Sequence, residues 1–194
     1  MKTEKPTTKI IAGKYKGKIL ELPSLDVTRS SKARLKESLF NVLQFDIIDK
    51  IFIESFAGSG SIGLEAISRG AKRAYFVELD RNSYQILLKN CKAVDMEKCQ
   101  TVQGNTFVQT PLFIDFLKNS KDEIVLYVDP PFDYRDGMED IYEKSFTMIK
   151  NIDVDNIYMI IVEHVSSLEM PEVLGRFSLN KTKQFGKSSL SYYF

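Results

Sequence analysis

An acidic side chain and a glycine-rich segment lie at the spacing of a nucleoside-binding site. The run Gly58-Ser59-Gly60-Ser61-Ile62-Gly63 follows an apolar stretch, and Glu78 comes 20 residues after the first glycine. Glycines let the backbone approach a ligand closely, and a helix beginning there offers N–H groups. A carboxylate at the end of the next strand can accept hydrogen bonds from both ribose hydroxyls. The pattern predicts a nucleoside site, and by itself it also fits a dinucleotide-dependent dehydrogenase.

A second acid favours one cofactor over the other. Glu54 precedes Gly58 by four residues, in the segment Glu-Ser-Phe-Ala-Gly-Ser-Gly. A carboxylate at this position would face the loop, where it suits a cationic amino acid group but repels a pyrophosphate. The segment resembles motif I of class I methyltransferases, which bind S-adenosylmethionine. We therefore expect S-adenosylmethionine as the cofactor.

The candidate catalytic residues follow the apolar segment 124–128. They are Asp129, Pro130, Pro131 and Phe132. Two prolines force an extended exit from a strand, so the Asp129 carboxylate and the Pro130 carbonyl would both stand as acceptors at the carboxyl end of a sheet. Such acceptors could hold the hydrogens of an exocyclic NH2 group and orient its nitrogen toward a methyl sulfonium. The Phe132 ring could stack on a base.

This tetrapeptide resembles the (Asp/Asn/Ser)-Pro-Pro-aromatic motif of amino-group methyltransferases. It lies about 70 residues after the glycine turn and is expected to follow a parallel strand. A C5-pyrimidine methyltransferase would need a nucleophilic cysteine in this region, where the sequence has none. The predicted reaction is methylation of an amino nitrogen.

Composition limits the other possibilities. The chain has 194 residues, 43% hydrophobic and 27% charged, which fits one soluble globular domain. Its polar start has no apolar core of a secretory signal, and no apolar run reaches the roughly 20 residues of a membrane span. The only cysteines are Cys91 and Cys99, and the only histidine is His164. These predict no metal site, no disulfide framework and a cytoplasmic protein, with His164 packed or at the surface and the cysteines structural.

Charge is distributed unevenly along the chain. Residues 1–36 contain ten lysines and arginines against three acids, a net charge of +7, whereas the rest of the chain carries −6. A basic segment on an acidic body is typical of a polyanion-binding attachment. On charge alone, a solvated lysine-rich terminus without a partner fits equally well.

The elements that would position these residues alternate in type. Residues 8–22 predict a hairpin around Gly13–Gly17, and Ser30 or Ser31 can cap a helix that runs to about Gln44. The segments that follow predict strands at 51–57, 74–78, 100–102, 124–128 and 157–162, helices at 61–69, 81–93 and 137–150, a helix interrupted near Pro111, and a terminal hairpin of 177–184 and 189–194 turned at Gly186. Such alternation predicts a mostly parallel sheet covered on both faces, with an antiparallel edge.

From residue 10 to its end the chain resembles the RsmD family of bacterial ribosomal RNA methyltransferases. The matching stretches are IIAGKYKGKILELP, ARLKESLFNVL, FAGSGSIGLEAISRGAKRAYFVELDRNSYQILLKN, DPPF, IIVEH and KQFGKSSLSYY. Ahead of the first helix the family usually shows Arg-Pro-Thr, where this chain has Arg29-Ser30-Ser31. The resemblance implies a class I, Rossmann-like α/β fold with a seven-stranded sheet, and methylation of N2 of a guanine in small-subunit (16S) ribosomal RNA.

The resemblance also assigns expected roles to individual residues. Asp129, Pro130, Pro131 and Phe132 would hold the guanine. The cofactor would be bound by Glu54, Phe56, Gly58, Ser59, Gly60, Glu78, Leu79 and Asn105. RNA phosphates would be contacted by Lys14, Lys16, Lys18, Arg29, Lys32 and Arg34.

We expect a basic hairpin and helix extension over residues 1–45 and a methyltransferase domain over residues 46–194. The expected partner is small-subunit ribosomal RNA or the assembling 30S subunit, and the expected state is a monomer. Alternatives of the same chemistry are methylation of a DNA adenine or a protein glutamine. From other classes, an inactive RNA-binding module and a nicotinamide dehydrogenase remain as rivals.

Overall fold

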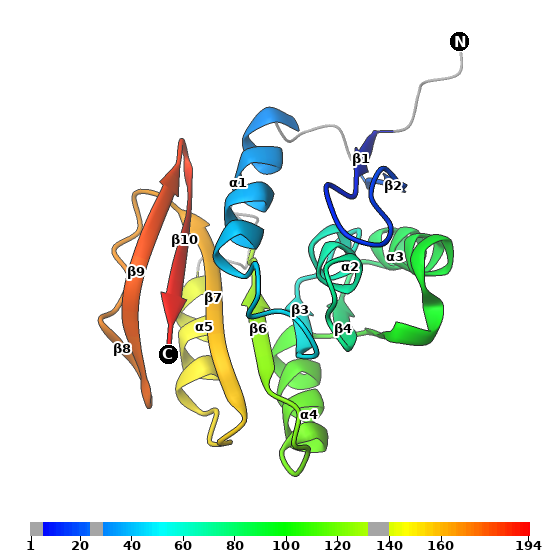
Figure 1. Cartoon of the computed structure of the whole chain (residues 1–194). Coiled ribbons are helices and arrows are strands. Elements are labelled where there is room, and N and C mark those ends of the chain that lie inside the picture. The colour runs from blue at the N-terminus through cyan, green and yellow to red at the C-terminus, as the bar shows by residue number, and fades with distance from the viewer. Residues whose placement is uncertain (1–5, 24–28, 132–139) are drawn as a thin grey trace.

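The structure is a computed structural model that describes residues 6–23, 29–131 and 140–194, without the side chains of residues 29–32. Its centre is one mixed sheet in the order β5-β4-β3-β6-β7-β10-β9-β8 (Figure 1). The strands are β3 (Ile51–Ser55), β4 (Arg73–Glu78), β5 (Cys99–Gln103), β6 (Ile124–Val128), β7 (Ile157–Val165), β8 (Val173–Leu174), β9 (Phe177–Phe185) and β10 (Ser188–Tyr193). The first five in the order are parallel and the last three antiparallel. The predicted α/β fold with a C-terminal hairpin is confirmed, and the short β8 adds an edge strand that was not predicted.

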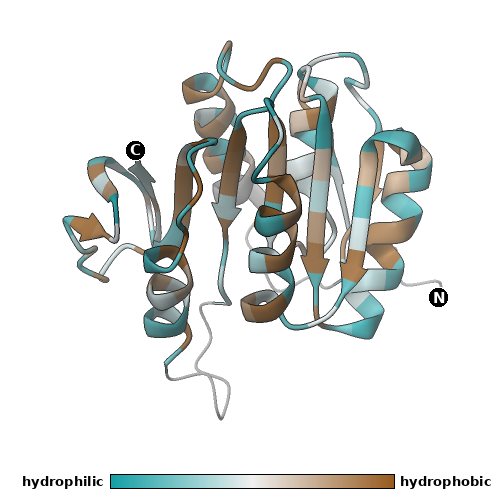
Figure 2. Ribbon diagram, turned by 90° about the horizontal axis from the view of Figure 1, so that it is seen from below, coloured by the Kyte–Doolittle hydropathy of each residue, from teal (hydrophilic) through white to brown (hydrophobic). Residues whose placement is uncertain are grey.

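Helices cover both faces of the sheet, so each face has its own hydrophobic core. The helices are α1 (Arg29–Val42), α2 (Ser61–Ser68), α3 (Arg81–Val94), α4 (Thr106–Leu117) and α5 (Ile141–Lys150), with a short 3-10 helix at Met96–Lys98. Leu39, Leu64 and Leu87 of α1, α2 and α3 lie in one core, and Ile114 and Phe146 of α4 and α5 lie in the other. The central strands are the most hydrophobic part of the chain (Figure 2) because both of their faces are buried. Within the described ranges, no helix is both long and apolar enough to cross a membrane.

Several predicted bounds differ from the structure by a few residues, and two predictions about helices were wrong. Helix α4 continues through Pro111 without interruption, although a proline removes one helical hydrogen bond. Burial of Ile114 and Leu117 against the sheet holds the helix beyond the proline, an example of tertiary packing overriding local propensity. Helix α1 begins at Arg29, before either serine that was expected to cap it.

The N-terminal segment forms the predicted hairpin, in which β1 (Thr7–Lys9) pairs antiparallel with β2 (Ile19–Glu21). Ile10, which follows β1, and Leu20, in the middle of β2, are almost completely buried. They belong to the same core as Phe52 of β3 and Tyr192 of β10. The hairpin therefore packs into the body of the molecule, and the division at residue 45 stays a prediction.

The strand order locates a crevice. From β3 the chain moves outward through β4 to β5, and it then returns to place β6 on the other side of β3. Ligands in open α/β sheets bind at the carboxyl ends of the strands where this reversal occurs. The predicted site residues should therefore lie beyond the ends of β3 and β6.

Candidate active site

A cavity of about 1680 Å³ opens at this crevice and continues between α4 and α5. Six of the predicted site residues line it: Phe56, Glu78, Leu79, Asn105, Asp129 and Pro131. They come from four separate segments of the chain, which the sheet brings together at the carboxyl ends of its strands. Glu54, Gly58, Ser59, Gly60 and Pro130 are not among the lining residues. Phe132 lies outside the described residues.

The glycine turn has the open backbone that a ligand site needs. Gly58 and Gly60 both have positive φ angles, of 54° and 74°. A Cβ atom on Gly58 would meet nothing within 4 Å, whereas one on Gly60 would lie 2.4 Å from Leu87. Gly58 thus leaves space for a ligand, and Gly60 allows α2 and α3 to approach each other.

Phe56 has a strained backbone in the same turn. Its φ of 61° is one of only two positive values among the described non-glycine residues. Its ring meets Phe107 of α4 edge to face, with centroids 5.7 Å apart. Strain of this kind costs about 1–3 kcal/mol and is found mainly at functional sites, so the Phe56 backbone supports a ligand-binding role for the turn.

Glu54 is buried behind the glycine turn. The side chain is 3% exposed, and its Oε2 accepts a hydrogen bond of 2.7 Å from the Gly63 N–H at the start of α2. A Cβ on Gly63 would lie 2.9 Å from this oxygen, so glycine is needed for the contact. Burial, helped by the charge of the nearby Asp129 carboxylate, raises the pKa of Glu54 to about 8, although the backbone hydrogen bond from Gly63 opposes this shift. Without a cation beside it, Glu54 is therefore mostly protonated at neutral pH.

Glu78 ends β4 at the wall of the cavity. Its two carboxylate oxygens accept hydrogen bonds from the backbone N–H groups of Gly58, at 2.6 Å, and Asp80, at 2.7 Å. Partial burial raises the pKa of this carboxyl group, while the backbone donors oppose the shift. Each oxygen retains a further lone pair, so the carboxylate is oriented to accept ribose hydroxyls.

Beside Glu78 the cavity wall changes from polar to apolar. Leu79 is 58% exposed and offers an apolar side chain to the cavity. Asn105 caps α4, where its Oδ1 accepts a hydrogen bond of 2.9 Å from Phe107 N–H. Its amide NH2 remains available to a ligand. This wall suits an aromatic heterocycle with polar edges.

Asp129 leaves β6 on the opposite side of the crevice. Its backbone N–H reaches the Ser55 carbonyl at the end of β3, at 3.4 Å, so it continues the parallel pairing. Asp129 and Pro131 face the cavity, whereas Pro130 is buried. Cofactor-binding and catalytic candidates therefore share one cavity, although Glu78 and Asp129 lie 51 residues apart in the sequence.

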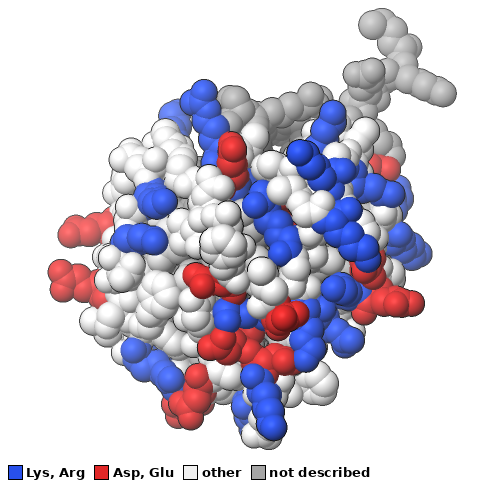
Figure 3. All heavy atoms as spheres, viewed as in Figure 1, with Lys and Arg blue, Asp and Glu red and all other residues white. Residues whose placement is uncertain are grey.

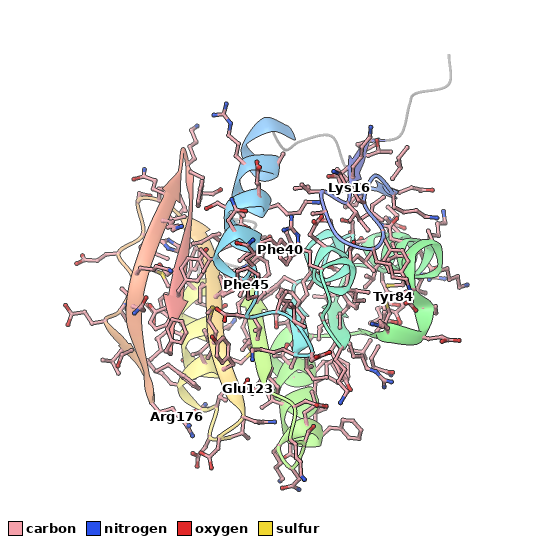
Figure 4. All side chains as sticks on the ribbon, viewed as in Figure 1. Lys16, Phe40, Phe45, Tyr84, Glu123 and Arg176 are labelled. Atoms are coloured by element: carbon pink, nitrogen blue, oxygen red, sulfur yellow. The ribbon has the colours of Figure 1, made fainter. Side chains whose placement is uncertain are left out.

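The predicted RNA contacts lie on the surface, apart from the cavity. Lys14, Lys16 and Lys18 are exposed on the N-terminal hairpin (Lys16 is labelled in Figure 4), and Arg34 is exposed on α1. The backbone N–H of Lys14 binds the carbonyl of Ser68, the last residue of α2. Because α2 has eight residues, this contact lies about 12 Å along the helix from the glycine turn. The side chains of Arg29 and Lys32 lie outside the described residues.

Two buried polar residues that the sequence did not single out fix this hairpin in place. The Glu65 carboxylate of α2 accepts hydrogen bonds from Ile11 N–H and Ala12 N–H, at 2.7 and 3.0 Å, and from Arg69 Nε at 2.8 Å. Its Oε2 also lies 3.5 Å from the ammonium group of the buried Lys36. A glutamate within an otherwise apolar helix stretch was the only sign of this role in the sequence.

Asn90 of α3 is the second of these residues, and it is 2% exposed. It forms a pair of hydrogen bonds with the Glu21 backbone, donating to the carbonyl and accepting from the N–H, both at 2.9 Å. Its NH2 group also donates to the Ser59 carbonyl at 2.9 Å. One amide thus joins the hairpin to the predicted cofactor loop.

The remaining candidates are structural. His164 is 1% exposed, with its ring nitrogens against the Val165 carbonyl and the Ser191 hydroxyl at 2.9 and 2.8 Å. Burial lowers its pKa, so the ring is neutral at physiological pH. Cys91 and Cys99 are buried free thiols.

Comparisons with known proteins agree with this geometry. A family model described as conserved hypothetical protein 95 matches residues 8–194. Ribosomal RNA small subunit methyltransferase D of Escherichia coli is 31% identical over 95% of this chain and 88% of its own length. The Haemophilus influenzae protein of the same name is 38% identical over 67% of this chain and 66% of its own.

The solved structure of yhhF from Escherichia coli has a TM-score of 0.72 with 30% identity, and covers 97% of both chains. This match extends from the N-terminal hairpin through the C-terminal strands. Both the sequence match over residues 8–194 and the conserved architecture lead to one assignment: the chain belongs to the RsmD family of ribosomal RNA small subunit methyltransferases.

Proposed function

We propose that this protein transfers a methyl group from S-adenosylmethionine to the exocyclic N2 amine of a guanine in small-subunit ribosomal RNA. The observation that carries the proposal is that one cavity is lined by Glu78 and by Asp129 and Pro131, in a chain of the RsmD family. The Escherichia coli relative bears the name of a ribosomal RNA small subunit methyltransferase. A nicotinamide dehydrogenase is disfavoured because the family model and the Escherichia coli relative both match nearly the whole chain.

The residues present fit this cofactor. Glu78 would accept both ribose hydroxyls, and Leu79 and Asn105 would contact the face and edge of the adenine. Phe56, Gly58, Ser59 and Gly60 would line the methionine part, with Glu54 as the nearby negative charge. When bound, the cofactor supplies an electrophilic methyl group on its sulfonium.

The protein's own contribution to the chemistry is to position the amine. The Asp129 carboxylate and the Pro130 carbonyl accept the two N–H groups of the exocyclic amine and so aim its lone pair along the cavity. The nitrogen becomes cationic only after attack, and its proton can then pass to Asp129 or to water. No strong base is needed beforehand, so positioning and preorganised acceptors supply the catalytic effect. Phe132 would stack on the guanine.

The substrate RNA defines where the enzyme works. We propose that the protein works in the cytoplasm on ribosomal RNA, free or in an assembling 30S subunit, and its two buried free thiols suit a reducing compartment. We propose that a monomer is active, since one chain supplies both the Glu78 and the Asp129 sides of the cavity. We propose an N-terminal extension over residues 1–45 on a catalytic domain over residues 46–194. The extension would contact RNA phosphates through its basic side chains, which are Lys14, Lys16, Lys18, Arg29, Lys32 and Arg34.

The decisive experiment is methylation of ribosomal RNA from a strain lacking the enzyme, with labelled cofactor and mapping of the labelled base. Asp129→Ala should abolish transfer yet leave S-adenosylhomocysteine affinity nearly unchanged, because its acceptors act on the amine. Glu78→Ala should weaken that affinity by about 1.5–3 kcal/mol, the cost of hydrogen bonds to a charged group. Label found on an adenine or on protein, or normal affinity in Glu78→Ala, would contradict these assignments.

The cofactor's amino acid end can be tested through protons. Burial raises the pKa of Glu54 to about 8, so the ligand-free carboxyl group is protonated at pH 6.0–7.5. A ligand ammonium group nearby would favour the carboxylate, and binding should release close to one proton in this range. Affinity for S-adenosylhomocysteine should therefore rise with pH toward about 8. Titration calorimetry in two buffers of different ionisation enthalpy measures this release, which Glu54→Gln should abolish.

A further inference from the structure

The β9–β10 hairpin carries basic side chains at the same edge of the sheet as the proposed active site. Ser188 of β10 pairs with Val165, the last residue of β7, so the turn at Gly186 lies beyond the carboxyl end of β7. Val162 of β7 in turn pairs with Val128 of β6, the residue before Asp129. The turn therefore lies at the edge of the sheet to which the cavity opens.

Lys183 is level with Asp129 along the strands. It pairs with Leu190 across β9 and β10, and Leu190 pairs with Glu163 across β10 and β7. Val162 pairs with Val128, and Glu163 and Asp129 each follow by one residue. One row across the sheet therefore contains Asp129, Glu163, Leu190 and Lys183. Three strand spacings separate β6 from β9, about 14 Å. Lys187 lies beyond this row, in the turn.

The turn is held firmly and its lysines remain exposed. The Ser166 N–H donates to the Lys187 carbonyl at 2.8 Å, and the Ser166 hydroxyl donates to the Gly186 carbonyl at 3.1 Å. Lys183 and Lys187 are exposed, and neither has an ion-pair partner within residues 6–23, 29–131 and 140–194. Basic side chains also follow the upper rim of the molecule over β9, α1 and the N-terminal hairpin, whereas acidic ones gather lower down (Figure 3).

We propose that Lys183 and Lys187 bind backbone phosphates of the substrate RNA on the β7–β10 side of the active site. This inference rests on the proposed function. A guanine that enters the cavity must leave its helix stack, and its neighbouring nucleotides must then lie on the protein surface. The phosphates that flank the methylated guanine on the β7–β10 side therefore lie within reach of the β9–β10 hairpin.

The test is a filter-binding salt series with small-subunit ribosomal RNA, free and as isolated subunits, alongside methyl transfer to the same RNA. The variant Lys183→Gln/Lys187→Gln should flatten the plot of log affinity against log salt by about one unit per lysine. Its affinity for S-adenosylhomocysteine should stay unchanged, which also shows that it is folded. Lys183→Arg/Lys187→Arg should keep the wild-type slope.

The matched control is Lys121→Gln/Lys150→Gln, which removes the same charge at the opposite, amino edge of the sheet. Both lysines are exposed there, Lys121 shortly before β6 and Lys150 at the end of α5. This control should retain the wild-type slope. A wild-type salt slope in the Lys183/Lys187 variant, or an equal flattening of the slope in the control, would overturn the proposal. The proposed function would still stand in that case if the wild-type protein methylated the RNA. Wild-type protein that neither bound nor methylated the RNA would overturn both.

Discussion

Two basic hairpins, one at each end of the chain, are built in different ways. The N-terminal pair β1–β2 has three residue pairs and is held to the body by side chains, chiefly Glu65, Ser68 and Asn90. The C-terminal pair β9–β10 continues the main sheet: β10 pairs with β7 from Ser188 to Tyr193 without a break, and it pairs with β9 with one register shift at Tyr192/Tyr193. The first depends on a few buried polar groups, and the second on a repeated backbone pattern.

This difference has a physical consequence. A two-stranded ribbon of three pairs is not stable alone, so its position depends on each contact with the body. An edge hairpin of a large sheet loses little when one contact is removed. We therefore expect single substitutions to displace the N-terminal hairpin far more easily than the C-terminal one.

The largest effect should come from Glu65→Ala. Removing this carboxylate leaves Lys36, which is 4% exposed, with its hydrogen bond of 2.8 Å to the Lys9 carbonyl but without its ion pair. It also leaves the Ile11 and Ala12 N–H groups without their acceptor. Breaking a buried ion pair in this way costs about 3–5 kcal/mol of unfolding free energy. Urea unfolding measures the loss. The double variant Glu65→Ala/Lys36→Met should be more stable than Glu65→Ala alone, and a loss below 1 kcal/mol would contradict the role given to Glu65.

A smaller but still large loss is expected from Gly13→Ala. Gly13 has a φ of 85°, and its Cβ would lie 1.8 Å from the Ser68 carbonyl oxygen, which the hairpin cannot accommodate without moving. The conformational cost and the clash together amount to about 3 kcal/mol. Gly17→Ala is the matched control, since its φ of 84° is similar and its Cβ would meet nothing within 4 Å. Thermal unfolding that gave equal losses for both would show that docking against α2 contributes nothing.

The smallest effect should be that of Gly186→Ala at the C-terminal turn. Its φ is 65° and a Cβ would meet nothing within 4 Å, so only the left-handed backbone conformation is penalised. We expect a loss of about 1 kcal/mol in urea unfolding. RNA affinity should stay close to that of wild type because the ladder to β7 keeps the turn in place. A loss as large as that of Gly13→Ala would remove the contrast between the two hairpins.

Much of the site was predictable from the sequence because its features are local. Gly58 and Gly60 need positive φ angles that few other residues adopt, and a strand followed by Asp129-Pro130-Pro131 has a restricted exit. The alternation of strand and helix likewise predicted a mostly parallel sheet, since short apolar strands must be covered on both faces. The specific roles of Glu54, Glu78, Leu79 and Asn105 stay predictions. The last three line the cavity, and Glu54 lies behind the glycine turn.

The tertiary structure alone decided which distant residues meet. The sequence around Glu65 and Asn90 does not indicate which backbone groups, 53 to 69 residues away, these side chains bind. Helix α4 passes through Pro111 because the packing of its apolar face outweighs one missing hydrogen bond. The charge count predicted RNA contacts only for the N-terminal basic residues, whereas strand register places Lys183 level with Asp129. Local backbone preferences are encoded residue by residue, but register and burial depend on the whole sheet, and these set the surface around the active site.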